Sequence, residues 1–173
     1  MWSVTPKPGT AKTVLAPRVY LPILLLLAVV VISVGPWLWK NADCSSYLRF
    51  KKDTYRNDRQ LAPKSGSLKL ELVTTTKEQT QGLSGRPCLP NDQGMLLDFG
   101  WQGFYPIWMK NMKFPIDIIW LNSSHTVTDL ELGVSPATYP QKFVNSKPAQ
   151  YVLELGVGQA ANLNISQGTT LKF

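Results

Sequence analysis

The chain has 173 residues and a formal net charge of +7. This length allows one domain with appendages and excludes two full-sized hydrophobic cores. The charge is uneven: residues 1–19 carry three basic residues and no acid, residues 40–64 carry seven basic residues and three acids, and residues 65–173 carry eight of each. A basic groove for nucleic acid is therefore not expected in the C-terminal part.

An apolar segment, Val19–Trp39, runs for 21 residues without a charge. About 20 apolar residues span a bilayer core as a helix. Tyr20, Trp37 and Trp39 stand near its ends, where amphipathic rings favour the membrane interface. The segment is therefore predicted to be a transmembrane helix. Pro36 follows the natural small-residue site for cleavage, and a cut after Ala42 would put Lys40 where a small residue is needed. Both observations favour an uncleaved signal anchor over a removed signal peptide.

The anchor divides the chain into four predicted parts: a basic head at 1–18, the membrane span at 19–39, a polar and basic linker at 40–65, and a β-rich domain at 66–173. Basic residues flank both ends of the span, so charge alone leaves its orientation open. A short basic head before an apolar run is the usual arrangement of an anchor. We therefore expect a single-pass protein of the inner or cytoplasmic membrane, with its C-terminal domain outside the cytoplasm.

Two cysteines and one histidine bear on covalent and metal chemistry. Cys44 lies in the linker and Cys88 in a loop, so a bridge between them would tether the linker, and we favour unbridged cysteines. His125 has no neighbouring ligand at metal spacing. We expect no metal site and no cofactor.

The first part of the domain alternates Leu68, Leu70 and Leu72 with Lys69, Glu71 and Val73, which predicts a half-buried strand. Thr75 and Glu78 have the spacing of a capping box, so a short helix is expected from there to about Ser84, ending at Gly85. Two turns follow, and then a short strand over Met95–Phe99.

The second part is predicted to be mainly strands. Pro115 divides IWMKNMKFPIDIIW into strands near Ile107–Lys110 and Ile116–Leu121, because proline cannot donate to a ladder. The remaining expected elements are strands at Thr126–Val134, Tyr151–Leu155 and Thr169–Phe173, and a short helix at Val157–Leu163. The pattern is typical of a mainly β (α+β) domain with two short helices, built as a small antiparallel barrel or sandwich.

Four segments, KEQTQGLSGR, GMLLDF, IWMKNMKFPIDIIWL and YVLELGVGQAANLNISQGT, together resemble the domain of unknown function 192 family over about Leu68–Phe173. The resemblance implies a small β-rich domain, often exported or membrane-tethered in prokaryotes, without an established role. Two departures are Ser84, where the family commonly has Met, and Ile107 before Trp108, where it commonly has Phe. The matching positions are Gly82, Leu83, Arg86, Gly94, Met95, Trp108, Met109, Lys110, Asn111, Pro115, Asp117 and the helix near Ala160.

The candidate site residues are Arg86, Trp108, Lys110, Asn111 and Asp117. They could form a polar network that pins loops over the core, with Asp117 paired to Lys110 or Arg86 if the strands before and after Pro115 pair.

They could instead form a shallow ligand site with Trp108 as a stacking face, suited to sugars or other polar cell-envelope ligands. A third reading pairs Asp117 with Asp129, Glu131 or Glu154 in a carboxylate-dependent hydrolase of envelope glycans. Without a recognisable catalytic motif, we expect a non-catalytic binding or accessory module for an envelope ligand or protein, with the hydrolase as the alternative.

Overall fold

The computed structural model describes Cys44, residues 55–61 and residues 67–173. The predicted head 1–18, the predicted span Val19–Trp39 and most of the predicted linker lie outside the described residues. Within those residues, no helix is both long enough and apolar enough to cross a membrane.

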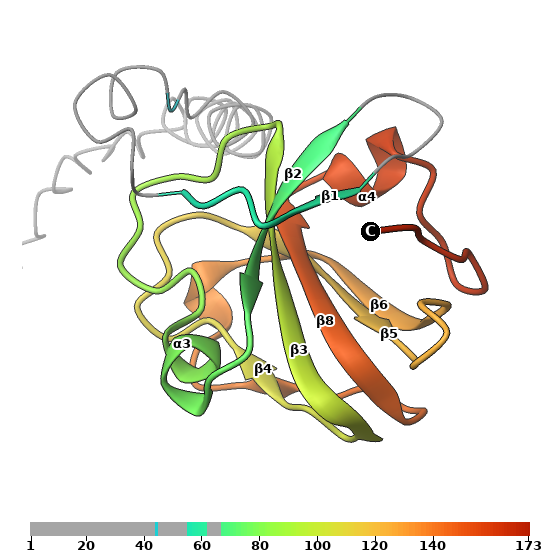
Figure 1. Cartoon of the computed structure of the whole chain (residues 1–173). Helices are drawn as coiled ribbons and strands as arrows, with labels where there is room; N and C mark the ends of the chain where they lie inside the picture. The colour runs from blue at the N-terminus through green and yellow to red at the C-terminus, as the bar shows by residue number, and fades with distance from the viewer. Residues whose placement is uncertain (1–43, 45–54, 62–66) are drawn as a thin grey trace, which may run out of the picture. The chain divides into compact units, whose positions relative to one another are not determined.

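The domain is built on one six-stranded sheet with a second, two-stranded sheet beside it (Figure 1). The large sheet has the order β1 (Arg59–Leu61), β2 (Leu68–Val73), β3 (Gln93–Gly103), β8 (Ala149–Gly156), β5 (Ile116–Leu121) and β6 (Val127–Val134). The small sheet pairs β4 (Ile107–Trp108) with β7 (Lys142–Phe143). The helices are α3 (Thr76–Gln81), α4 (Gln159–Asn162) and a 3-10 turn at Pro136–Thr138.

The predicted class, mainly β with two short helices, is confirmed, but the large sheet is neither purely antiparallel nor, within the described residues, a closed barrel. β2 and β3 pair in parallel, so the sheet is mixed. Within the described residues the sheet also stays open, with β1 and β6 at its two ends. The loop that holds α3 crosses between β2 and β3, and this crossover is what makes the pair parallel.

Several predicted boundaries differ from the observed ones. The strand predicted at Met95–Phe99 runs from Gln93 to Gly103, past an irregularity that contains Gly100 at a φ of 78°. The closing strand predicted at Thr169–Phe173 is wrong, because that segment forms a single bridge between Thr170 and Thr126. β1 lies in the segment predicted as linker and pairs with β2.

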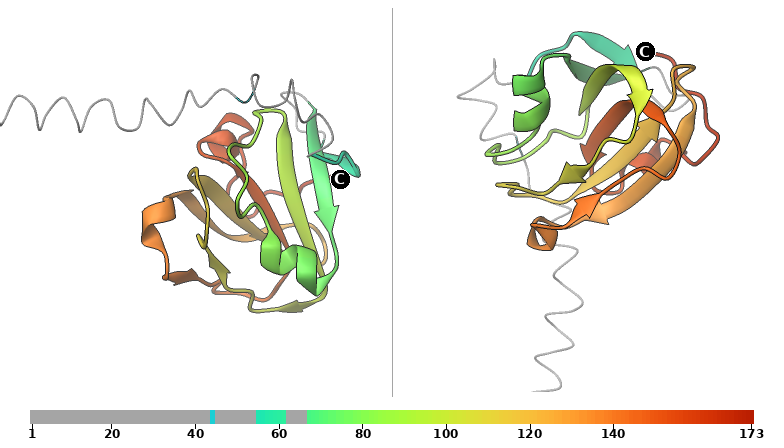
Figure 2. Two further views of the ribbon diagram at one scale, coloured as in Figure 1. Left: turned by 90° about the vertical axis from the view of Figure 1, so that its left-hand side faces the viewer. Right: turned by 90° about the horizontal axis from the view of Figure 1, so that it is seen from below.

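Apolar side chains cover both faces of the large sheet. In β5, Ile116, Ile118 and Trp120 enter one core cluster, while Ile119 and Leu121 enter the other, because successive side chains of a strand point to opposite faces. The first face is covered by the α3 loop and the β4 segment, which contribute Leu83, Ile107 and Met109. The second face is covered by β1, α4 and the C-terminal segment, which contribute Leu61, Ala160, Ile165 and Leu171. Figure 2 shows the two sets of covering segments on opposite sides of the curved sheet.

Cys44 and Cys88 form a disulfide, so the expectation of unbridged cysteines is wrong. The bridge fixes Cys44 to the loop between α3 and β3, where both cysteines are buried. The Tyr55 hydroxyl donates a hydrogen bond to the Cys88 carbonyl in the same place. The predicted linker therefore contributes at least Cys44, Tyr55 and β1 to the folded domain.

Candidate binding pocket between α3 and β4

The position of α3 follows from its two ends. The Thr75 hydroxyl accepts a hydrogen bond from the Glu78 N–H at 3.3 Å and donates one to Glu78 Oε2 at 2.8 Å, which confirms the predicted start of the helix. The helix ends at Gly82, with a φ of 48° that glycine adopts readily, three residues before the predicted Gly85. The early end frees Gly82–Gly85 to form a loop over the first core cluster.

This loop is bound to the turn that follows β4. The Ser84 hydroxyl donates to the Lys110 carbonyl at 2.8 Å, and the Gly85 N–H donates to the Asn111 carbonyl at 2.9 Å. Asn111 adopts a φ of 56°, a conformation that asparagine tolerates better than most residues. Lys110 and Asn111 therefore hold the loop with their backbone carbonyls, and α3 and β4 become the two walls of a pocket.

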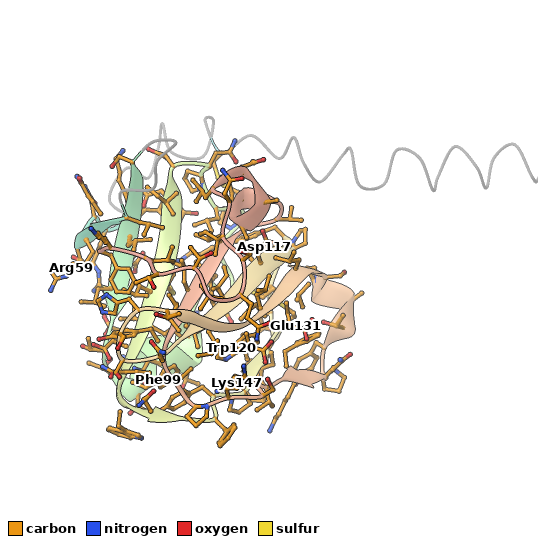
Figure 3. All side chains as sticks on the ribbon, turned by 90° about the vertical axis from the view of Figure 1, so that its right-hand side faces the viewer. Arg59, Phe99, Asp117, Trp120, Glu131 and Lys147 are labelled. Atoms are coloured by element: carbon orange, nitrogen blue, oxygen red, sulfur yellow. A yellow bond between two sulfur atoms is a disulfide. The ribbon has the colours of Figure 1, made fainter. Side chains whose placement is uncertain are left out.

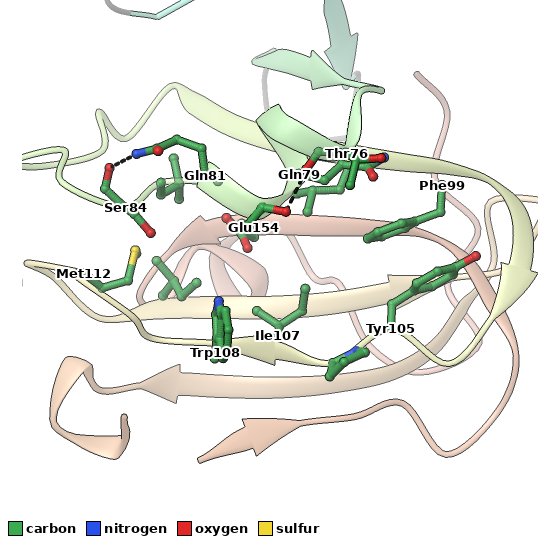
Figure 4. Close-up of a pocket in the computed structure, with 16 residues that line it drawn as sticks. Thr76, Gln79, Gln81, Ser84, Phe99, Tyr105, Ile107, Trp108, Met112 and Glu154 are labelled. Carbon is green, nitrogen blue, oxygen red and sulfur yellow. Dashed lines mark hydrogen bonds between the residues drawn. The ribbon is translucent and has the colours of Figure 1, made fainter. Parts of the chain in front are cut away.

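The pocket has a volume of about 320 Å³. One wall consists of Thr76, Gln79, Thr80 and Gln81 of α3, and the other contains Ile107 and Trp108 of β4 (Figure 4). Apolar and aromatic side chains make up most of the remaining lining: Leu83, Leu97, Phe99, Tyr105, Pro106, Met112 and Ile116. A more open groove, lined also by Lys77, Lys110 and Asn111, continues along α3 and Trp108.

Glu154 is the polar side chain on the pocket floor. It lies on β8, faces the first core cluster and is only 5% exposed. Its Oε2 atom has no hydrogen-bond partner within the described part of the chain. Burial raises the pKa of the Glu154 carboxyl to about 7, and the positive charge of Arg86 offsets this only in part. Figure 4 shows this carboxyl between α3 and the side chains of Trp108 and Ile107.

The sequence profile of one family, DUF192, described as "Uncharacterized ACR", matches residues 59–173. The chain belongs to the DUF192 family. Among curated proteins none matches it. Two solved structures are similar to the DUF192 domain, each with a TM-score of 0.60.

The first solved structure is a candidate transcription regulator from Sinorhizobium meliloti 1021, which is 32% identical over 65% of this chain and 89% of its own. The second is a protein of unknown function from Novosphingobium aromaticivorans DSM 12444, which is 28% identical over 66% of this chain and 82% of its own. They support the fold of the DUF192 domain, and neither name assigns a ligand to its pocket.

Arg86 lies behind the pocket of the DUF192 domain and is already paired. Its two terminal nitrogens donate to Glu71 Oε2 at 2.8 Å and Oε1 at 2.9 Å, in a bidentate arrangement. Its guanidinium also lies 4.9 Å from the centre of the Tyr55 ring. The predicted partner Asp117 takes no part, so Arg86 ties the α3–β3 loop to β2 through Glu71.

Trp108 stands at the rim of the pocket with 37% of its surface exposed. The Nζ atoms of Lys110 and Lys142 lie 5.6 and 5.4 Å from its ring centre, and Tyr139 meets it edge to face. Three of the five predicted site residues, Trp108, Lys110 and Asn111, therefore lie together around one opening.

Asp117 lies on the other face of the sheet, beside α4 (Figure 3). Its Oδ1 accepts a hydrogen bond from the Gly133 N–H at 2.9 Å, and its Oδ2 accepts one from the Ala160 N–H at 3.1 Å. β4 pairs with β7 while β5 pairs with β6 and β8, so the condition for a contact between Asp117 and Lys110 is not met. Asp117 holds backbone groups of β6 and α4 together.

Sequence reasoning named Glu154 only as one of several partners for Asp117 and did not identify the pocket. The segment YVLELG contains a pattern that could have pointed to Glu154. This acid stands between two leucines in a strand that is buried on both faces. Phe99 and Tyr105 could not have been found by spacing. They stack with ring centres 3.7 Å apart, and Phe99 lies in the irregular part of β3, which spacing does not predict.

Proposed function

We propose that the DUF192 domain is a non-catalytic binding module, which holds a small organic ligand of the cell envelope in the pocket between α3 and β4. The observation that carries the proposal is the buried Glu154 carboxyl, which lines an otherwise mostly apolar pocket and whose Oε2 has no hydrogen-bond partner among the described residues. Buried polar groups are nearly always hydrogen-bonded, so an unpaired one in a pocket marks a place for a ligand atom.

The proposal also includes the anchor at Val19–Trp39 and a domain outside the cytoplasm. The disulfide between Cys44 and Cys88 supports this location, because disulfides persist in oxidising compartments and are rare in the cytosol. A polar face at the rim, made by Trp108 with Lys110 and Lys142, would contact the part of the ligand that extends out of the pocket.

The geometry gives less support to the alternative of a carboxylate-dependent hydrolase. That chemistry needs two carboxyl groups about 5–10 Å apart on either side of the scissile bond. Among the described residues that line the pocket, Glu154 is the only acid, and both oxygens of Asp117 are bound on the other face of the sheet.

The name of the Sinorhizobium relative suggests gene regulation as another function. DNA binding depends on basic surface that neutralises phosphates. The balanced charge of residues 65–173 and the acidic floor of the pocket do not favour it.

A screen of the full-length protein in detergent micelles tests the proposal. Ligand-observed NMR would be run with a library of small amines, alcohols, carboxylic acids and cell-wall sugars. We expect ligands that bind the wild type and lose binding in Thr80→Trp, because Thr80 is exposed at the pocket opening and an indole there would fill it.

The matched control is Asn162→Trp, which adds the same ring to α4 on the other face of the sheet. This variant should bind like the wild type. If no compound in the library distinguishes wild type from Thr80→Trp, the domain does not use this pocket for ligands of these classes.

A further inference from the structure

We infer that the pocket takes an organic amine, with its ammonium group on Glu154 and its apolar body against the aromatic walls. This inference rests on the proposed function and names the chemical class of the ligand. It starts from the charges that line the pocket. Glu154 is the only charged side chain among the described lining residues, and none of them is basic.

Among the described residues, none forms an ion pair with Glu154. Glu71, Met95 and Glu154 are neighbours across β2, β3 and β8, so both acids lie on the same face of the sheet. Arg86 stands close enough to affect both electrostatically, but its guanidinium is engaged by the two oxygens of Glu71. An ionised carboxylate at the Glu154 position therefore needs a cation from outside, and an ammonium group also supplies the missing hydrogen bond to Oε2.

The walls suit the rest of such a ligand. Phe99, Tyr105 and Trp108 present aromatic rings to the pocket, and aromatic rings attract cations. Trp108 already has the ammonium groups of Lys110 and Lys142 within 5.6 Å of its ring centre. Both lysines are exposed and lie outside the lining of the Glu154 pocket.

Gly82 leaves the space next to the Glu154 carboxyl free of a side chain. A Cβ atom at this position would lie 3.7 Å from Glu154 Oε2, where it would occupy the space in front of the carboxyl. The pocket volume of about 320 Å³ limits the ligand to a small molecule. An alkyl or arylalkyl amine therefore matches both the size and the chemistry of the site.

The pH dependence of binding separates an amine from other ligand classes. The groups that face Glu154 are Arg86 and Glu71, which are paired with each other, and Tyr105 in the wall, whose pKa is raised by burial. Glu154 is then the group that titrates near neutral pH, with a pKa of about 7. Because an ammonium ligand needs the ionised carboxylate, its affinity should rise through pH 7. A carboxylic acid would need the protonated carboxyl, so its affinity should fall.

The test uses isothermal titration calorimetry with hexylamine, 1-hexanol and hexanoate on the full-length protein, between pH 5.5 and pH 8.5. We expect hexylamine to bind best, with an affinity that falls about tenfold per pH unit below pH 7 and is constant above it. Glu154→Gln should lose at least about tenfold in hexylamine affinity at pH 8 and should lose the pH dependence. Glu131→Gln removes an exposed acid of β6, and it should change neither the hexylamine affinity nor its pH dependence.

Two results of this titration would overturn the inference. Tighter binding of hexanol or hexanoate than of hexylamine, lost in Thr80→Trp, would show that the pocket is a ligand site for another class, and the proposed function would stand. Hexylamine affinity that is equal in wild type and Glu154→Gln would show that the amine does not use the carboxyl. A negative library screen would overturn the proposed function as well.

Discussion

Glu154 should make the stability of the domain depend on pH in a way that a surface acid does not. Its pKa is about 7 in the folded chain, against 4.5 for an ordinary glutamate. Well below pH 4.5 the carboxyl is protonated in both the folded and the unfolded chain, so its titration does not change the free energy of unfolding there. Between pH 4.5 and 7 the unfolded chain loses the proton first, so the free energy of unfolding falls as the pH rises.

We therefore expect Glu154→Gln to stabilise the domain at pH 8 and not at pH 4. The difference should be on the order of 3 kcal/mol at most, because each pKa unit corresponds to about 1.4 kcal/mol. Urea denaturation of both proteins at several pH values measures it. A difference that does not change with pH would mean that Glu154 titrates normally in the folded protein. A gain in stability with a loss of amine binding is the trade-off expected of a binding residue.

The polar residues of IWMKNMKFPIDIIW show what one sequence can and cannot reveal at the residue scale. The alternation of side chains along a strand places the residues of β5 on two faces, since this period is local. It could not reveal that Asp117 accepts hydrogen bonds from Gly133 and Ala160, because both partners are distant in sequence. Asp117 fits the interpretation of a structural network, while Trp108 stands at the pocket rim.

At the scale of elements, Arg86 and Glu71 connect the loop after α3 to β2. Their side chains are 15% and 9% exposed, so the pair is largely removed from water. Arg86→Ala leaves the Glu71 carboxylate buried without its main partner, which typically costs about 3–5 kcal/mol. We expect a loss of that size in the free energy of unfolding, measured by urea denaturation at pH 7.

The double variant Arg86→Met with Glu71→Leu is the control for charge. It removes both charges and keeps apolar volume, so it should recover most of the stability lost in Arg86→Ala. If the double variant is as unstable as Arg86→Ala, the pair acts through its shape and hydrogen bonds, and the burial of a lone charge is not the cause.

The elements themselves were predicted well where the signal is local and poorly where it depends on pairing. The capping residues Thr75 and Glu78 located the start of α3, and the alternating leucines located β2. The parallel pairing of β2 with β3 and the pairing of β4 with β7 join segments whose periodicity does not specify a partner. The pocket depends on those pairings, so no local pattern could predict it.

At the scale of the whole molecule, the Cys44–Cys88 bridge connects the fold to its proposed location. The two cysteines are 44 residues apart in sequence. Closing a loop of that length removes conformational entropy from the unfolded chain, worth about 4 kcal/mol in the loop-entropy treatment. We therefore expect the Cys44→Ser, Cys88→Ser double variant to unfold at a lower urea concentration than the oxidised wild type. Each single variant should unfold at about the same urea concentration as the double variant, because either substitution removes the bridge.

The state of the bridge in cells tests the proposed location. We expect native membranes to yield a protein whose cysteines resist a maleimide–polyethylene glycol reagent under denaturing conditions and react twice after reduction. A domain outside the cytoplasm meets an oxidising environment, where such a bridge persists, whereas a cytosolic domain would keep both thiols reduced. The single variants report whether each thiol is reachable once its partner is gone. Two reactive thiols in the unreduced wild type would contradict the extracytoplasmic placement, and would leave the pocket and its amine chemistry to be judged on their own tests.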